Sequence, residues 1–495
     1  MVPEENKIIY DYCIVGAGPV GLTLAFLFSK IGKKCVVLDN MSSIGGCHRV
    51  NRISTPGDAY GLFTEHSPRI YSNSYVNTIN ILKNMNINFF DLFTPYNFSV
   101  SNIGGKTISS LSKRELFLFV IEFFKLYFNP NHGRDISMEA FLTKHNFKEE
   151  SKDFIDRLCR LTDGAGIDRY TLYEFLNLAN QEAFYKIYQP KLPNDLGLFK
   201  QWQDYLENTN LVDIRLNYNV NKLIGINKIT SCEAQNIKDN KNYTLFAKNF
   251  ILAIPPKAIY KILENSGESI KKSFGPFTKL NQLQKHSSYI TDPAITFHWN
   301  KKLQLPKIWG MPSSDWGIAF ILLSDYMDFK DPRSKTLFSC CITRLDSISN
   351  FTGKTANQTS NKQELINEVL RQLKLTYPNL PKPTFSILSP TVYYNNNQWE
   401  ETDSAYVETH MQMVLNSHGK LSNLFNCGMH NGNSIYAFTS LEGAVTNAMV
   451  LAQKIEPQTK FLKVKSMYTL ISLIKRIFLL LIIILVLIII VRMKR

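Results

Sequence analysis

The chain has 495 residues, of which 44% are hydrophobic and 20% charged, so it is long enough for two domains with a sizeable core. Its formal net charge of +15 is compatible with nucleic-acid binding. However, eight basic residues and no acidic residue lie from Lys460 onward, so much of the excess charge belongs to the C-terminal tail. No basic helix or base-stacking motif accompanies that charge, and we expect no nucleic-acid partner.

The eight cysteines include no Cys-x-x-Cys pair and fall mostly within predicted core elements, which is typical of a reduced compartment. The N-terminal residues contain no apolar signal region. We therefore expect the body of the protein to lie in the cytosol and to bind no metal.

A nucleotide-binding turn is predicted near the N-terminus. Residues 8–15 have the β-branched and aromatic composition of a strand, and they lead directly into a G-x-G-x-x-G turn. The first glycine permits a sharp turn, the second lets backbone N–H groups approach a pyrophosphate, and the third lets the following helix pack closely. That helix is predicted up to Gly32, with its N-terminus facing the phosphates. The expected cofactor-binding residues of the turn are Gly16, Ala17, Gly18, Pro19 and Gly21.

An acidic residue follows at the position that a dinucleotide requires. The next predicted strand, residues 35–38, leads to Asp39, eighteen residues after Gly21. A carboxylate there can accept hydrogen bonds from ribose hydroxyls. The glycine turn alone is a weak signal, but together with both strands and Asp39 it predicts dinucleotide binding, which could be NAD or FAD.

The segment Gly45-Gly46-Cys47-His48-Arg49 distinguishes between these two cofactors. An acidic residue, a short spacer, a Gly-Gly pair and a nearby arginine resemble the flavin-containing amine oxidase and phytoene desaturase superfamily, which includes protoporphyrinogen oxidase-like proteins. The resemblance implies that Asp39 binds the adenosine ribose of FAD. It also implies that Gly45, Gly46 and Arg49 reach the middle of the cofactor. The alternative is a plain glycine turn followed by a surface arginine.

A second segment resembles the same family. Phe250 to Ile254 form an apolar strand that stops at Pro255-Pro256, because proline donates no hydrogen bond to a sheet and restricts the preceding residue. The resemblance implies that Val220, in the preceding strand pair, contacts the adenine side of FAD through its backbone. The sequence departs from the family upstream, where Asn194-Asp195-Leu196-Gly197 stands in place of a frequent Gly-Gly pair.

The third segment, residues 424–452, resembles the closing motif of the family. A strand ends at Gly428, and Ser440 is a plausible N-cap for an apolar helix. A helix N-terminus that points at a flavin can stabilise negative charge on the ring. The residues expected near the cofactor are Gly428, Ser440, Leu441, Gly443 and Ala444. The family often has an acidic residue after this glycine, where this chain has Met429.

These observations predict an α/β fold. It combines a Rossmann-type FAD-binding domain of discontinuous segments with an α+β substrate domain and a C-terminal membrane helix. Residues 107–190 have helical periodicity, residues 285–410 are rich in short β-type runs and aromatics, and residues 346–363 read as a surface loop. The predicted FAD-binding segments are 1–72, 195–265 and 421–456; the helical cap is 73–194, the substrate-domain sheet 266–420, and a linker 457–466.

The C-terminal residues 467–495 are predicted to anchor the protein in a membrane. Fifteen uninterrupted apolar residues, Ile477 to Val491, are flanked by basic residues. As a helix they would span about 22 Å against roughly 30 Å of hydrocarbon, which a thin bilayer and snorkelling basic side chains can accommodate. We therefore expect a single-pass tail anchor with the body on the cytosolic side.

The predicted reaction is hydride transfer from a small-molecule substrate, an amine or a lipid or isoprenoid, to N5 of non-covalent FAD, with reoxidation by oxygen or another acceptor. Two alternatives stay open. One is a redox-neutral isomerase of the UDP-galactopyranose mutase type, and the other is a non-catalytic FAD-binding scaffold. The aromatic cage typical of amine oxidases is in doubt, because Ser440 and Leu441 occupy positions near one of its walls.

Three residues are candidates for the reaction site. His66 and Arg69 follow the first FAD segment, where relatives pass beside the flavin, and Tyr406 is a possible aromatic wall. For His66 and Arg69 the alternative is a loop histidine and an arginine paired with a surface acid. No catalytic lysine or base can be assigned by spacing.

Overall fold

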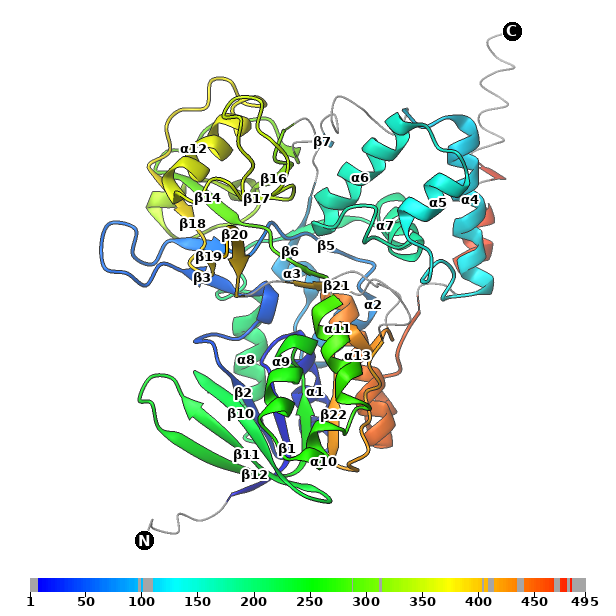
Figure 1. Cartoon of the computed structure of the whole chain (residues 1–495), viewed down its shortest axis with the longest axis vertical. Coiled ribbons are helices and arrows are strands. Elements are labelled where there is room, and N and C mark those ends of the chain that lie inside the picture. Colours follow the sequence, from blue (N-terminus) through cyan, green and yellow to red (C-terminus); the bar gives the residue numbers. More distant parts are fainter. Residues whose placement is uncertain are drawn as a thin grey trace.

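The computed structural model describes residues 8–96, 99–100, 110–286, 288–310, 314–402, 405–407, 414–433, 440–466, 472–478 and 481–482. In Figure 1 a large sheet with its helices forms the lower body of the molecule. A smaller sheet with helix α12 lies at the upper left, and a group of helices lies at the upper right. The mixed α/β, Rossmann-type architecture predicted from the sequence is confirmed.

The large sheet has seven strands in the order β10-β11-β12-β1-β2-β9, with β22 also paired to β12. β1 pairs in parallel with β12 and β2, and further parallel pairs join β2 to β9 and β12 to β22, whereas β10, β11 and β12 are antiparallel. The strands are β1 (Ile9–Val15), β2 (Cys35–Asp39), β9 (Val212–Leu216), β10 (Tyr218–Gly225), β11 (Ile229–Asn236), β12 (Asn242–Leu252) and β22 (Leu424–Asn426). The carboxyl ends of the parallel strands therefore meet at one edge, where such sheets bind ligands.

Helices cover both faces of this sheet. One core contains side chains of α1 (Pro19–Lys30), α8 (Leu198–Asn208) and α13 (Leu441–Ile455). The opposite core contains side chains of α9 (Pro256–Glu264), α10 (Glu268–Lys271) and α11 (Phe277–His286).

Helices α10 and α11 therefore pack on the nucleotide-binding sheet, although the predicted boundary at 265/266 assigns them to the substrate domain. The reason is that Ile270, Leu280 and Leu283 are buried in the core of the large sheet. The polar sequence around these residues gave no sign of that tertiary contact.

Residues 113–184 form four helices with a hydrophobic core of their own. They are α4 (Lys113–Phe128), α5 (Met138–Lys144), α6 (Glu149–Asp163) and α7 (Leu172–Phe184). A capping box formed by Ser112 and Glu115 starts α4, and Gly164 in the left-handed conformation ends α6. The rest of the predicted cap segment is α2 (Val76–Asn84), α3 (Phe89–Leu92) and a small sheet of β5 (Tyr71–Ser72), β8 (Ile187–Pro190) and β6 (Phe93–Pro95).

The second sheet is antiparallel, in the order β16-β17-β14-β18. Its strands are β14 (Ala294–Trp299), β16 (Ile318–Leu322), β17 (Thr336–Ile342) and β18 (Phe385–Leu388). Helix α12 (Lys362–Leu373) packs its apolar residues into the same core as Trp299 and Trp316. These two tryptophans are therefore core residues and not part of a site wall.

Four short strand pairs complete the described β structure. They are β3 (Val50–Arg52) with β4 (Phe63–Glu65), β7 (Ser99–Val100) with β15 (Ile308–Trp309), β13 (Ser288–Ile290) with β21 (Ala405–Val407), and β19 (Val392–Asn395) with β20 (Gln398–Glu401). Pairing of β3 with β4 and of β19 with β20 brings two distant parts of the chain close to the second sheet.

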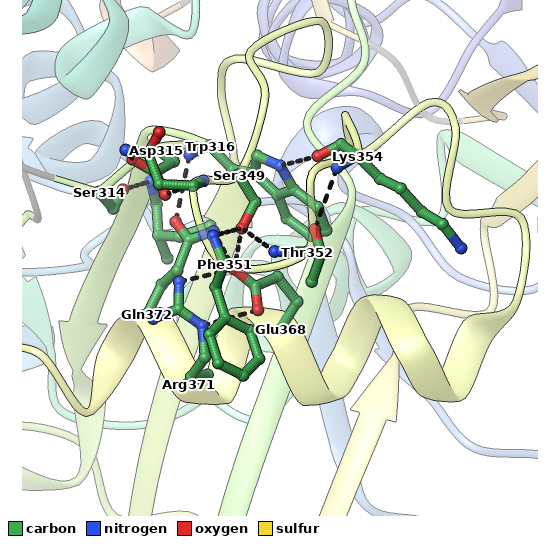
Figure 2. A network of polar contacts seen from close by, with 12 residues as sticks. Ser314, Asp315, Trp316, Ser349, Phe351, Thr352, Lys354, Glu368, Arg371 and Gln372 are labelled. Carbon is green, nitrogen blue, oxygen red and sulfur yellow. Dashed lines mark hydrogen bonds and ion pairs between the residues drawn. The ribbon is translucent and has the colours of Figure 1, made fainter.

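The polar residues before α12 are held by a buried carboxylate (Figure 2). Oε1 of Glu368 accepts hydrogen bonds from Ser349 Oγ (2.7 Å), Arg371 Nη2 (2.8 Å) and Gln372 Nε2 (2.8 Å). Oε1 of Gln372 in turn accepts a bond from the backbone N–H of Trp316 at 3.1 Å. The predicted surface loop, residues 346–363, is thus attached to α12 through the hydrogen bond between Ser349 and Glu368. We call Ser349, Glu368, Arg371 and Gln372 the α12 network.

Most of the predicted membrane segment 467–495 lies outside the described residues. Among the helices that the structure does describe, none combines the length and the apolar character needed to cross a membrane. Residues 472–478 are helical, and Arg476 donates hydrogen bonds to the hydroxyls of Tyr127 and Tyr185. This part of the tail therefore lies against α4.

Candidate functional site

The glycine turn is shaped by contacts within the protein itself. Gly16 has φ +111°, and a Cβ placed there would lie 2.4 Å from the carbonyl oxygen of Ala253. A Cβ on Gly21 would lie 1.9 Å from the carbonyl oxygen of Gly16. Both positions therefore require glycine for the fold, since no side chain fits against the backbone there.

Gly18 is different, because its own neighbours leave room for a Cβ. A Cβ on Gly18 would make only an ordinary contact of 3.6 Å with Cα of Gly46, which belongs to the predicted Gly-Gly pair. Helix α1 starts after Gly18 with Pro19 and has no side-chain cap. A shallow glycine surface at an uncapped helix N-terminus fits a pyrophosphate. We call Gly16, Gly18, Gly45 and Gly46 the glycine cradle.

Asp39 lies beside this cradle at the end of β2. Its Oδ2 accepts a hydrogen bond from the backbone N–H of Ala17 at 2.8 Å, and its Oδ1 accepts one from Met41 at 2.9 Å. The guanidinium of Arg49 is 3.3 Å from Oδ1. This acidic end of the strand, next to the turn, fits recognition of a ribose.

Arg49 departs from one of its two sequence interpretations. Its side chain is buried, so the alternative of a surface arginine is wrong. Its Nε donates to the carbonyl oxygen of Ser43 at 2.7 Å while the guanidinium contacts Asp39, so Arg49 lies at the Asp39 end of the cradle. Its role toward the middle of FAD stays a prediction.

The second predicted segment adjoins the first. The backbone N–H of Ala253 donates to Val15 at 2.8 Å, and that of Cys427 donates to Leu252 at 3.0 Å, so the ends of β1, β12 and β22 lie together. Val220 is buried on β10 at an irregularity in the pairing with β11. Just before it, the backbone N–H of Asn217 donates to Met41, which brings β10 close to the loop after Asp39.

The third segment places a helix N-terminus at the same edge. Oγ of Ser440 accepts a hydrogen bond from the backbone N–H of Gly443 at 2.9 Å, which confirms the predicted N-cap. A Cβ on Gly443 would lie 2.7 Å from Cε of Met429, the residue after Gly428. Leu441 and Ala444 are buried beside them in the core that also contains α1.

Glu442 joins the third segment to α2, at the start of the predicted helical cap. Its fully buried carboxylate accepts hydrogen bonds from the backbone N–H groups of Asn77 and Thr78, each at 2.9 Å. Oγ1 of Thr78 donates a third bond at 2.9 Å. Glu442 therefore caps the N-terminus of α2, which has no cap of its own at Tyr75.

A second group of polar residues lies where the first FAD segment meets the second sheet. We call Glu65, His66, Arg69, Asp292 and Glu401 the buried polar cluster. Nδ1 of His66 is 2.7 Å from Oε2 of Glu401, and these side chains are only 2% and 0% exposed. Burial raises the pKa of both Glu65 and Asp292 to about 7, although Arg69 and His66 act in the opposite direction.

The cluster is connected to the glycine cradle through Arg69. Nη2 of Arg69 donates to the carbonyl oxygen of Cys47 at 2.7 Å, one residue after Gly46. Within the part of the chain that the structure describes, no hydrogen-bond partner is found for four buried polar atoms in this region, which are Asn51 Nδ2, Arg69 Nε, Gln189 Oε1 and Asn194 Oδ1. Buried polar groups are ordinarily satisfied, so these atoms mark a place for a polar ligand.

The structure brings two of the three predicted reaction-site candidates together. His66 and Arg69 both belong to the cluster, and the carboxylate nearest His66 is a buried one, Glu401. The side chain of Tyr406 lies outside the described residues. Its backbone in β21 stands opposite Tyr289 in β13.

Sequence reasoning missed the three carboxylates. Glu65 and His66 are adjacent, but Asp292 and Glu401 lie more than 200 residues beyond them, and no spacing rule connects such distant positions. In the described part of the chain, this cluster included, no group of His, Cys, Asp or Glu residues is arranged to hold a metal ion.

Comparison with known proteins supports the assignment of a nucleotide-binding fold. Residues 14–83 match the family described as NAD(P)-binding Rossmann-like domain. A search of curated proteins found no significant sequence match. The matched segment contains the end of β1, the glycine cradle, Asp39 and the start of the buried polar cluster.

Three solved structures share the architecture over nearly the whole chain. An oxidoreductase from Methanosarcina mazei has a TM-score of 0.62 at 12% identity and covers 89% of this chain and 99% of its own. Putrescine oxidase bound to putrescine has a TM-score of 0.61 at 13% identity, and the match covers 91% of this chain and 99% of that one. Cyclohexylamine oxidase from Brevibacterium oxydans has a TM-score of 0.57 at 13% identity, and the match covers 91% of this chain and 100% of that one.

The chain has the fold of these oxidoreductases. The resemblance to the amine oxidase superfamily, which rested on short motifs, is confirmed at the level of the fold. The glycine cradle, Asp39 and the α13 N-terminus occupy one edge of the sheet, as an extended dinucleotide requires. The fold and the groups that line this edge therefore fit a dinucleotide cofactor.

Proposed function

We propose that the protein is an FAD-dependent oxidoreductase that takes a hydride from a small-molecule substrate. The observation that carries this proposal is the connection of the buried polar cluster to the glycine cradle through Arg69 and Cys47. FAD, when bound in the cradle, supplies the hydride acceptor at its N5 atom. The cluster would then face the substrate, because its polar atoms are buried and incompletely paired.

The charges of the cluster favour an amine as the substrate. It contains three carboxylates, from Glu65, Asp292 and Glu401, against the guanidinium of Arg69 and the imidazole of His66. A substrate ammonium group would supply the missing positive charge to carboxylates whose burial is otherwise unfavourable. Glu65 and Asp292, with pKa values of about 7, can also take up a proton from the substrate near neutral pH.

FAD binding is tested with two glycine variants. The purified protein should show a yellow flavin spectrum, and Gly18→Ala should weaken flavin binding without changing the unfolding temperature of the flavin-free protein, because a Cβ there makes only ordinary contacts with the backbone of Gly46. Gly267→Ala is the matched control, since a Cβ at that surface position contacts nothing within 4 Å. Protein that shows no flavin spectrum, and gains none with added FAD, would remove the proposal.

The substrate class is tested by anaerobic bleaching of bound flavin. A panel of amines should reduce it, whereas bleaching only by isoprenoids would replace the amine with a lipid substrate. Activity on a sugar nucleotide only after dithionite reduction would indicate an isomerase instead. A flavin that responds to none of these compounds would leave an FAD-binding scaffold.

We also propose that the protein is attached to a membrane through residues 467–495. The apolar run at 477–491 supports this proposal, and α4 adds a second observation. Its large apolar side chains Phe117, Val120, Ile121 and Phe128 are 38–84% exposed, although a soluble surface rarely gathers such residues on one helix.

Membrane attachment is tested by fractionation. The full chain should sediment with membranes, resist high salt and be released by detergent. Deletion of residues 467–495 should move most of the protein to the soluble fraction. A full chain that is soluble without detergent would overturn the proposal.

A further inference from the structure

A row of four polar side chains begins inside the buried polar cluster and leads away from it. Its inner members are His66 and Glu401, whose Nδ1 and Oε2 atoms lie 2.7 Å apart. Its outer members are Thr391, just before β19, and Ser389, just after β18. Oγ1 of Thr391 donates to Oε1 of Glu401 at 3.1 Å, and Oγ of Ser389 lies 2.8 Å from Oγ1 of Thr391. We call these four residues the polar row.

The polar row is removed from solvent along its whole length. None of its four residues is more than 6% exposed. Burial of polar groups is unfavourable unless they are hydrogen-bonded, and burial of a carboxylate is especially so. The row is therefore a built arrangement within the fold and not a set of surface contacts.

The hydroxyl groups determine the direction of the hydrogen bonds along the row. A hydroxyl carries one proton, and that of Thr391 is donated to Glu401. The contact between Thr391 and Ser389 therefore has Ser389 as its donor. Because Thr391 holds Oε1 of the carboxylate, Oε2 is left to contact His66. The two hydroxyls thus fix the rotation of the Glu401 side chain.

Strand β14 of the second sheet holds both ends of the row. At the outer end, the backbone N–H of Ser389 donates to the carbonyl oxygen of Ala294 at 2.8 Å. At the inner end, Oγ1 of Thr296 donates to the carbonyl oxygen of Phe63 at 3.3 Å, three residues before His66. One strand therefore sets the distance between the histidine and the residues that support its partner.

The β19–β20 hairpin places Thr391 beside Glu401. Val392 and Glu401 stand opposite each other in the hairpin, and the backbone N–H of Thr402 donates to the carbonyl oxygen of Thr391 at 3.1 Å. The two side chains therefore meet through regular strand pairing. Supporting residues on such elements hold a functional group more precisely than residues on loops.

The two ring nitrogens of His66 have different surroundings. Nδ1 contacts Oε2 of Glu401, although the ring is not aligned with it for a linear hydrogen bond. For Nε2, no partner is found within the part of the chain that the structure describes. A carboxylate beside Nδ1 favours the tautomer with the proton there, so the lone pair lies on Nε2. Such bonds often become fully aligned only when the ligand is present.

Other charged groups of the cluster also act on His66. The carboxylates of Glu65 and Asp292 interact with it electrostatically. The charge of His66 acts against protonation of His48, and Arg69 is the other base of the cluster. An imidazolium formed at His66 would thus have carboxylate neighbours besides Glu401, which stabilise its charge.

We infer that His66 accepts, at Nε2, the proton that a substrate ammonium group loses before the substrate is oxidised. In this step the N–H bond of the ammonium breaks, its electron pair stays on the substrate nitrogen, and a new N–H bond forms at Nε2. Glu401 stabilises the imidazolium, and Thr391 and Ser389 are positioning residues that act through Glu401. The role toward an amine rests on the proposed function, whereas the arrangement of the polar row does not.

The arrangement is tested by solid-state NMR on the full chain, labelled with nitrogen-15 at its nine histidines. The signal of His66 is identified by its loss in His66→Gln. Above neutral pH the ring should carry its proton on Nδ1, and Glu401→Gln should move part of that proton to Nε2. A wild-type ring that carries its proton on Nε2 would overturn the inference.

The proton transfer is tested by stopped-flow bleaching of the bound flavin with benzylamine and with hexylamine. His66→Ala should slow bleaching about 100-fold or more, and added imidazole should restore part of the rate because it supplies the missing base. Bleaching of this variant at the wild-type rate would overturn the inference. Slow bleaching that imidazole does not restore would assign the proton to Glu65 or Asp292, and would overturn it as well.

The positioning role is tested with variants of Thr391. Thr391→Val keeps the shape of the side chain but removes the hydroxyl, and should slow bleaching about tenfold, the effect of one hydrogen bond to a charged group. Flavin content and KM should not change, and Thr391→Ser should regain most of the rate. Thr230→Val, which removes an exposed hydroxyl from β11, is the control.

A double variant shows whether Thr391 acts through the carboxylate. Combined with Glu401→Gln, Thr391→Val should add no further loss, because the group that it positions is already gone. Independent, additive losses would exclude the positioning role. This comparison also serves if His66→Ala does not fold.

Failure of this inference is distinct from failure of the proposed function. If an amine bleaches the flavin of the wild type and of His66→Ala equally fast, only this inference falls. If neither amine bleaches the flavin, the amine substrate and the proton transfer fall together. A proton on Nδ1 that depends on Glu401 would in that case still establish the arrangement of the polar row.

Discussion

Two buried carboxylate sites in this molecule have opposite characters. In the α12 network, burial alone would raise the pKa of Glu368, but hydrogen bonds from Arg371, Gln372 and Ser349 outweigh it and hold the pKa below its ordinary value. In the buried polar cluster, burial dominates and raises the pKa of Glu65 to about 7. One carboxylate is fully partnered, and the other is not.

This difference in hydrogen bonding indicates that Glu368 has a structural role and that Glu65 belongs to a ligand site. Glu368 has three side-chain donors within hydrogen-bond distance, so its site is complete within the protein. Glu65 is equally buried, but its pKa of about 7 and the unpaired atoms around it indicate a site that a ligand completes. Each prediction below compares the two sites.

The largest expected effect is a pH dependence of stability caused by Glu65. Its pKa is about 7 in the folded chain against 4.5 for the free side chain, so the folded state binds the extra proton between these values. The free energy of unfolding should therefore fall by about 3 kcal/mol as pH rises from 4.5 to 7. Urea unfolding at several pH values measures this slope. Glu65→Gln should remove this contribution and leave the part of the slope that comes from Asp292, whose pKa is also about 7; an unchanged slope would contradict the assignment.

The next effect is on turnover. Glu401→Gln removes the carboxylate beside His66 but keeps its shape, so turnover with a substrate that bleaches the flavin should fall about 100-fold, or roughly 2.7 kcal/mol. The unfolding midpoint should change little. Glu400→Gln, on the same short strand but half exposed, is the control. Equal turnover in both variants would exclude Glu401 from the reaction site.

The α12 network should show the reverse behaviour. Glu368→Ala leaves Ser349 and Gln372 without their acceptor, and should lower the free energy of unfolding by about 2 kcal/mol. Because Arg371 is 28% exposed, it can turn to water, which limits the loss. Turnover should be unaffected. Glu364→Ala on the exposed side of the same helix should cost less than about 0.5 kcal/mol, and a similar cost for both would refute the network's role.

The smallest effect concerns the start of α12. Oδ1 of Asn361 accepts hydrogen bonds from the backbone N–H groups of Gln363 (2.8 Å) and Glu364 (3.1 Å). Asn361→Ala should lower the free energy of unfolding by about 1 kcal/mol, as for other N-caps. Flavin content and turnover should stay at wild-type levels. A loss of turnover here would mean that α12 acts on the reaction site after all.

The parts that the sequence predicted well depend on neighbours along the chain. The glycine turn, its helix and Asp39 follow within 24 residues, so their periodicity and spacing already determine the local geometry. The Ser440 N-cap was predictable for the same reason, since it bonds to Gly443, three residues away.

The remaining features depend on contacts between distant residues. Glu401 meets His66 only because the β19–β20 hairpin folds onto the second sheet. Beyond the predicted boundary at 265/266, a few apolar residues of α10 and α11 join a core built from other segments. Single-sequence patterns contain no information about such pairings.

The cap that Glu442 provides for α2 affects when the protein can fold during its synthesis. Asn77 and Thr78 leave the ribosome some 365 residues before the carboxylate that completes their helix. β22, which pairs with β12, is also made long after its partner strand. The dinucleotide-binding body therefore cannot close before Glu442 has been made, and we expect the cofactor to bind after that point. A ribosome stalled before residue 424 should carry a nascent chain that holds no flavin.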